Sequence, residues 1–177
     1  MAGARAARFT HLARRFVGSL RPGGPGPADE RWAVDQLGPG EALLWRRMRG
    51  ADRRHAVGVA RRTVAALGAE ASRPVVAAAL LHDVGKVESG FGTLRRTAAT
   101  VLGPAIGQDR ARRWAGAAGV RGRFGSYLTH DELGAGMLRS AGSDPLTAAW
   151  AREHHLPPDR WTVPASVGRA LKDADDD

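Results

Sequence analysis

The sequence predicts an all-α protein. Apolar residues recur at helical spacing through most of the chain, and no stretch shows the strict alternation that is typical of a half-buried strand. Serine, aspartate and proline precede these apolar segments and glycine often follows them, as at the ends of helices. The length of 177 residues suits one domain with a single core. We therefore expect a compact multi-helix bundle.

The N-terminal part differs in composition from the rest. Residues 1–20 are basic and amphipathic, and no acidic residue occurs before Asp29. Residues 21–28 read RPGGPGPA, which is typical of a linker. We therefore predict a flexible basic extension over 1–28, followed by a helical domain over 29–177. The extension is interpreted as loosely packed rather than as a membrane-surface or partner-docking helix, because a helix of this length is marginal alone.

The domain is expected to contain a series of helices separated by short loops. Asp29 and Asp52 are predicted N-caps, and Gly68 and Gly142 are predicted to end helices. The expected helices cover residues 29–37, 41–48, 53–67, 72–84, 93–106, 108–118, 127–138, 146–155 and 165–174.

The helix expected over 72–84 carries the least usual sequence. Its apolar run AALL leads directly into His82 and Asp83, and Gly85 and Lys86 follow. Gly85 is predicted to be the left-handed residue that closes the helix. Buried polar groups need partners, and a shared metal ion is one good partner for this pair. Taken alone, the pair is equally well explained as a hydrogen-bonded histidine beside a helix-terminal carboxylate.

Composition narrows the classes of function. There is no cysteine, so disulfides and thiolate metal sites are excluded. The net charge of +9 comes almost entirely from arginine in a chain rich in Ala and Gly, so we give the basic charge little weight as a sign of nucleic-acid binding. No stretch approaches the ~20 apolar residues of a membrane span, and no secretory signal is evident. A cytoplasmic protein is expected, and its oligomeric state stays open.

The histidines form an ordered series. After His82-Asp83 come His130 and the pair His154-His155, while His55 precedes them, and the chain ends in an acidic cluster. Five of the six histidines lie in or at the ends of the predicted apolar helices. A set of His and Asp without Cys suits iron, manganese, zinc or magnesium, and the number of candidate ligands is sufficient for one or two ions.

The same residues carry a resemblance to a known family. The segments DRRHAVGVA, LLHDVGK, THDELGAGML, EHH and LKDAD follow one another between residues 40 and 177. Their order and spacing resemble the HD-domain metal-dependent phosphohydrolases, and the HDIG and HD-GYP branches look most similar. The Gly-Tyr-Pro segment of the HD-GYP branch is absent, because Leu156-Pro157-Pro158 stands at that place. Hydrolysis of cyclic di-GMP is therefore not the expected activity.

The resemblance implies an all-α fold and a specific set of ligands. The first metal would be held by His55, His82, Asp83 and Asp175, where Asp175 is chosen over Asp173 because LKDAD aligns best with the family's helix-borne motif. A second metal would add His130 and one or both of His154 and His155.

The implied activity is hydrolysis of a phosphate ester by metal-activated water, with a nucleotide or another small phosphorylated molecule as substrate. Asp83 would bridge two ions, Lys86 would contact phosphate oxygens, and His130 would hold the second ion or protonate the leaving oxygen. From physics alone, Lys86 is almost equally well explained as a solvated residue.

Other classes of function remain open at this point. The chain could be a regulatory or signalling module that keeps the metal site without turnover, or an oxidative di-iron enzyme with the same fold. Charge-driven nucleic-acid binding is the third alternative, and it predicts an affinity that depends steeply on salt.

Overall fold

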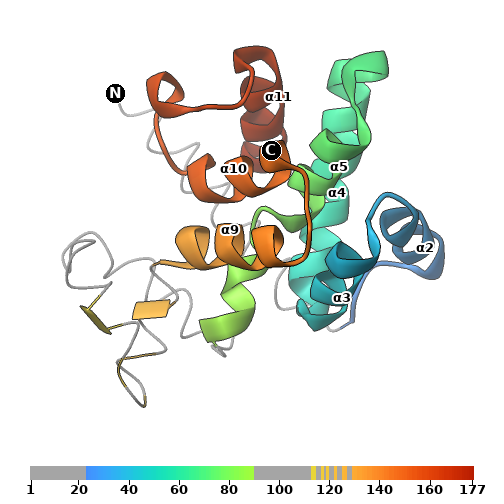
Figure 1. Cartoon of the computed structure of the whole chain (residues 1–177). Coiled ribbons are helices and arrows are strands. Elements are labelled where there is room, and N and C mark those ends of the chain that lie inside the picture. Colours follow the sequence, from blue (N-terminus) through green and yellow to red (C-terminus); the bar gives the residue numbers. More distant parts are fainter. Residues whose placement is uncertain are drawn as a thin grey trace, which may run out of the picture.

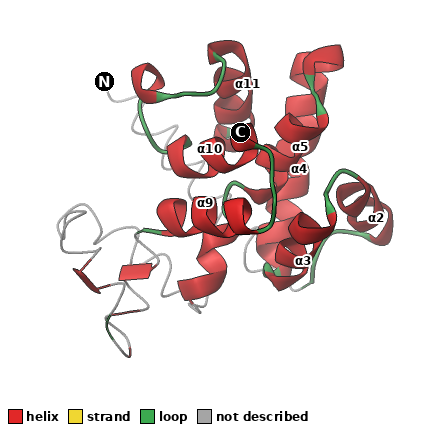
Figure 2. Cartoon of the chain, in the orientation of Figure 1, coloured by secondary structure: helices red, strands yellow, loops and turns green. Residues whose placement is uncertain are grey.

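The computed structural model describes residues 23–89 and 129–177, together with a few single positions between 113 and 126. This described part is helical and contains no strand, so the all-α prediction is confirmed there (Figure 2). Its α-helices are α2 (Pro27–Asp35), α3 (Pro39–Arg47), α4 (Gly50–Leu67), α5 (Arg73–Leu81), α9 (His130–Ser140), α10 (Pro145–Glu153) and α11 (Ala165–Asp176). Three 3-10 helices, η1 (Gly68–Glu70), η2 (Val84–Ser89) and η3 (Pro158–Arg160), lie between them.

Helix α5 lies in the core of the described residues. Every residue from Val75 to Leu81 is buried. A helix that is apolar all round requires neighbours on every side, and α5 packs against α3, α4 and α10. The apolar run recognised in the sequence therefore forms the centre of the core, and the His-Asp pair follows at the end of this central helix.

The remaining helices pack around this centre in pairs. In Figure 1 the orange α9 lies beside α10, with the red α11 beyond α10, and α4 runs along α5. Helix α11 also packs on α4, and η2 packs on α9. Trp45 and Trp150 are the largest fully buried side chains in the described residues. This arrangement brings the end of α5 together with parts of α4, α9, α10 and α11.

The predicted helix over 72–84 ends earlier in the structure. Ser72 is the N-cap and Pro74 lies in the first turn, as predicted, but α5 stops at Leu81. His82 and Asp83 form a turn, and η2 begins at Val84. The pair therefore lies just beyond the helix.

Two predicted N-caps are wrong. Helix α2 begins at Pro27 after Gly26, and α4 begins at Gly50 after Arg49, so Asp29 and Asp52 lie inside the first turns. A proline is well suited to the first position of a helix, and acidic residues in a first turn interact favourably with the helix dipole. The first residues of α2 consequently fall within the predicted linker.

Three glycines were predicted to end helices, and two of them do so with a positive φ whereas the third does not. Gly68 and Gly142 have φ values of +55° and +75°, beyond α4 and α9 respectively. Gly85 does not have a positive φ, so the predicted left-handed role is wrong. Instead, a Cβ at Gly85 would lie 1.8 Å from the backbone oxygen of His130. This glycine is needed for the close approach of η2 to α9.

Several predictions fall outside the described residues. These are the basic segment over 1–20, the helix expected over 93–106 and most of the helix expected over 108–118. Within the described part, no helix combines the length and the apolar character that a membrane crossing requires.

Candidate metal centre

Seven predicted site residues converge from five places in the chain. His55 lies in the second turn of α4, and His82 and Asp83 follow α5. His130 is the first residue of α9, His154 and His155 follow α10, and Asp175 lies in the last turn of α11. The structure brings all seven together in two groups, each of which has its ligand atoms within 4.8 Å of one another.

The first group consists of His55, His82 and Asp175. The Nε2 atom of His55 lies 2.9 Å from Oδ1 of Asp175, within hydrogen-bond distance. His82 Nε2 lies 3.6 Å from the same oxygen. Asp175 is buried, whereas Asp173 is exposed, so the packing of α11 places Asp175 and not Asp173 beside the histidines.

The second group consists of Asp83, His130, His154 and His155. Oδ1 of Asp83 lies 3.4 Å from Nε2 of His130 and 3.7 Å from Nε2 of His154. The other oxygen, Oδ2, lies 3.5 Å from Nε2 of His82, which belongs to the first group. Asp83 therefore stands between the two groups and faces both.

Backbone carbonyls fix the orientation of two of the histidines. His82 Nδ1 lies 2.9 Å from the carbonyl oxygen of Ala79, and His154 Nδ1 lies 3.0 Å from that of Ala151. A carbonyl oxygen can only accept, so in both rings Nδ1 carries the proton and donates it. In the neutral ring the lone pair then resides on Nε2, which points into the cluster, as in many metal-binding histidines.

The same two Nε2 atoms provide a test of whether a metal fits. Within the described residues, both are buried without a hydrogen-bond partner. An unsatisfied buried polar atom costs about 1–3 kcal/mol. His82 and His154 belong to different groups, so a cation in each group would satisfy the Nε2 atom that faces it. Two ligands of one tetrahedral ion lie about 3.3 Å apart when each is about 2 Å from the ion. The Asp83–His130, Asp175–His82 and Asp83–His154 separations of 3.4, 3.6 and 3.7 Å are close to this value. The residues fit a divalent cation.

Electrostatics within the cluster also favour a cation. Burial raises the pKa of Asp83, but Lys86, His82 and His130 outweigh it and hold that pKa well below its ordinary value. Burial lowers the pKa of His82, yet the Asp83 and Asp175 carboxylates leave it raised. The carboxylate of Asp83 is therefore ionised at neutral pH.

The two adjacent histidines behave differently from His82. Burial, followed by the nearby His155 and His82, lowers the pKa of His154 well below its ordinary value. Burial and His130 lower the pKa of His155 to about 4, although part of this side chain is exposed. Both rings are neutral at pH 7, which is the form that binds a metal.

Lys86 lies at the edge of the cluster. Its Nζ contacts Oδ2 of Asp83, and 16% of its side chain is exposed. The ammonium group is therefore next to the carboxylate that faces both groups and also reaches solvent. This position suits contact with an anionic substrate.

Sequence reasoning did not identify Glu153, which organises the loop after α10. Its buried carboxylate accepts hydrogen bonds from the backbone N–H of Thr162 (2.6 Å) and from the Thr162 hydroxyl (2.8 Å). The indole Nε1 of Trp161 donates to the carbonyls of Glu153 and Leu156. These bonds fix the segment that begins with His154 and His155. The only sequence signal was the position of Glu153 directly before that pair.

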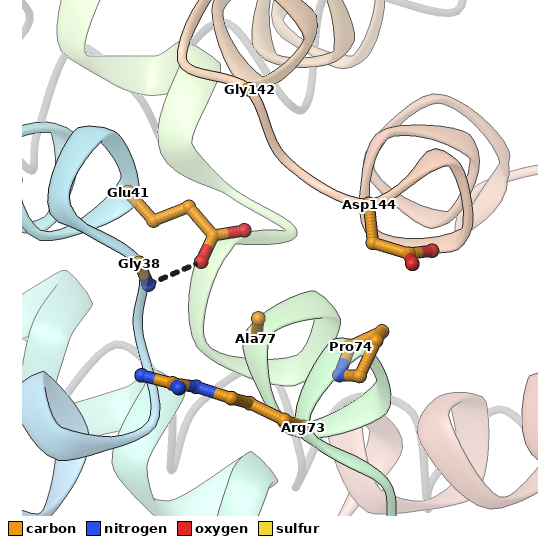
Figure 3. Close-up of a pocket in the computed structure, with 7 residues that line it drawn as sticks. All are labelled: Gly38, Glu41, Arg73, Pro74, Ala77, Gly142 and Asp144. Carbon is orange, nitrogen blue, oxygen red and sulfur yellow. Dashed lines mark hydrogen bonds between the residues drawn. The ribbon is translucent and has the colours of Figure 1, made fainter.

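A separate pocket of about 230 Å³ lies away from this cluster, near the N-terminal end of α5. Figure 3 shows Glu41, Arg73 and Asp144 around it, with Glu41 bonded to the backbone N–H of Gly38. Arg73 donates to the carbonyls of residues 35–37 and so ties α5 to the end of α2. None of the predicted site residues lines this pocket. Its charged side chains cap the starts of α3 and α10 or link α5 to the segment after α2.

Comparison with known protein families identifies the region that contains the cluster. A family model described as "HD domain" matches residues 53–176, which is more than half of the chain and includes all seven residues of the cluster. Comparison with curated proteins and with solved structures gives no significant match.

Proposed function

Because the chain belongs to the HD-domain family, whose members are generally metal-dependent hydrolases, we propose that it hydrolyses a small phosphate ester. The observation that supports this most directly is the pair of His/Asp groups that face each other across Asp83, with Lys86 at their edge. A nucleotide is the substrate class that we would test first.

The ligands divide according to the two groups. His55, His82, Asp83 and Asp175 would hold one ion, and Asp83, His130, His154 and His155 would hold a second. A divalent ion in such a site lowers the pKa of water and polarises a phosphoryl oxygen. Manganese, iron, zinc and magnesium all suit a set of His and Asp ligands.

The chain's own residues would supply orientation and charge. The carbonyls of Ala79 and Ala151 fix the rings of His82 and His154 before any ligand arrives, so these donors need little rearrangement. Lys86 would move from Asp83 to a phosphate oxygen and neutralise part of the substrate's charge. His130, buried at the start of α9, would hold the second ion or protonate the leaving oxygen.

The test combines metal analysis with an activity panel. The purified protein is loaded with manganese, iron, zinc or magnesium and assayed against phosphomonoesters, phosphodiesters and nucleotides. Replacing Asp83 by Ala should abolish metal binding and hydrolysis, because Asp83 contacts both groups. Asp173→Ala is the matched control, since Asp173 is exposed on α11 and should leave both properties unchanged. Full metal content and activity in Asp83→Ala would contradict the proposal.

A further inference from the structure

We infer that Arg62 is a positioning residue that holds Asp175 in place for metal binding. The inference rests on the proposed metal site and concerns a residue outside both ligand groups. Arg62 lies on α4, and its guanidinium reaches across to the last turn of α11. There it donates from Nε (2.9 Å) and from Nη2 (2.7 Å) to the carbonyl oxygen of Ala174, the residue before Asp175.

The last turn of α11 needs such support. Carbonyls in the last four residues of a helix lack the partners of the helix interior, and Ala174 lies within this turn of a helix that ends at Asp176. The turn also carries Asp173, Asp175 and Asp176 and no basic residue. Negative charge at a helix C-terminus opposes the helix dipole. A guanidinium on the Ala174 carbonyl offsets both effects at the point where the ligand is attached.

Helix α4 is arranged to supply both the ligand and its support. His55 and Arg62 are seven residues apart, which is close to two turns, so both lie on the face that packs on α11. Gly58 lies between them, and a Cβ there would lie 3.3 Å from Nη1 of Arg62. One face of α4 therefore makes two contacts with the end of α11. His55 contacts the Asp175 side chain at 2.9 Å, and Arg62 contacts the backbone carbonyl of the residue before it, Ala174.

This arrangement predicts that substitution of Arg62 weakens binding of the ion in the first group and not of the ion in the second group. Asp175 belongs to the first group only, whereas the second group is built from the ends of α5, α9 and α10. Loss of the Arg62 hydrogen bonds should allow Asp175 to move away from His55 and His82. Residues that orient metal ligands typically contribute about 10–100-fold to metal affinity, so we expect a loss of this size for the ion held by Asp175.

The experiment is calorimetric titration of chelator-treated full-length protein with Mn²⁺ alone. Asp175→Asn first identifies the binding event that depends on this carboxylate. Arg62→Met, which keeps an apolar stem, should weaken that same event by about 10–100-fold and leave any other event unchanged. Arg62→Lys should recover part of the loss, since an ammonium can donate to the carbonyl without the two-donor fork.

Arg61→Met is the matched control. Arg61 is the neighbouring residue on α4 but lies over the ring of Trp32 and pairs with Asp29, away from α11. The Arg61→Met variant should bind Mn²⁺ with the same affinity as wild type. The unfolding midpoint of each metal-free variant is measured alongside.

The outcomes separate the inference from the proposed metal site. An Arg62→Met protein that is merely less stable but binds Mn²⁺ normally would overturn the inference, as would equal weakening of all events or the same loss in Arg61→Met. A wild-type chain that binds no Mn²⁺ would instead overturn a manganese site, and failure to bind iron, zinc and magnesium as well would overturn the metal site itself.

Discussion

Replacing Gly85 by Ala tests how closely the second group of ligands depends on backbone contact. A Cβ at this position would lie 1.8 Å from the carbonyl oxygen of His130 and 2.7 Å from the backbone nitrogen of Gly134. Carbon and oxygen atoms normally approach no closer than about 3.3 Å. Because both obstructing atoms are backbone, η2 and α9 would have to separate by about 1.5 Å.

The consequence for the site can be worked from the distances. His130 Nε2 and Asp83 Oδ1 are 3.4 Å apart. If η2 and α9 move apart by about 1.5 Å, these two atoms would be up to about 5 Å apart. Two atoms that each lie about 2.1 Å from one ion can be at most about 4.2 Å apart. The variant should therefore lose the ion of the second group and about 1–3 kcal/mol of unfolding free energy from overpacking.

The assay is metal content per chain together with urea unfolding of the metal-free protein. Gly136→Ala is the control, since Gly136 lies on α9 without a positive φ, and a Cβ there would come no closer than 3.9 Å to Arg139 Nη2, its nearest neighbour among the described residues. Alanine is favoured over glycine inside a helix by about 0.5–1 kcal/mol, so this control should be neutral or slightly stabilised. If Gly85→Ala kept both its metal content and its stability within about 0.5 kcal/mol of wild type, the reasoning about this contact would be refuted.

Two further predictions concern charge. The Lys86→Met variant should bind Mn²⁺ no more weakly than wild type. Its kcat/KM for a phosphate ester should fall by about 10–100-fold, because that factor corresponds to the loss of one charge-assisted hydrogen bond. Steady-state kinetics would check this, and an unchanged kcat/KM would contradict it. In metal-free protein, unfolding free energy should fall as pH decreases from about 6.5 to 4. The unfolded His155 takes up a proton at its ordinary pKa, whereas in the folded chain its pKa is lowered to about 4. His154 acts in the same direction. The raised pKa of His82 acts at a higher pH, because its stabilising contribution is fully present below about 6.5 and is lost only as pH rises above that value. His155→Gln should flatten this slope in urea titrations at several pH values, and a slope as steep as wild type would count against the role of His155.

Much of the fold follows from local sequence. Helical spacing of apolar residues predicted the helical class, and Gly68 and Gly142 marked helix ends because glycine adopts a positive φ readily. The order of His55, His82-Asp83, His130 and His154-His155 indicated the residues that the structure brings together. These features depend on residue type and short spacing, which a sequence displays directly.

The tertiary structure decided how those residues face one another. Asp173 and Asp175 are two residues apart and thus about 200° apart around a helix. The family resemblance had favoured Asp175, and the packing of α11 on α4 supplies the physical reason, because it turns this carboxylate and not that of Asp173 toward the histidines. The division of the ligands into two groups about Asp83 and the contact that requires glycine at position 85 likewise depend on α9 and α10. The sequence by itself determined which groups are available, whereas their directions depend on contacts between segments far apart in the chain.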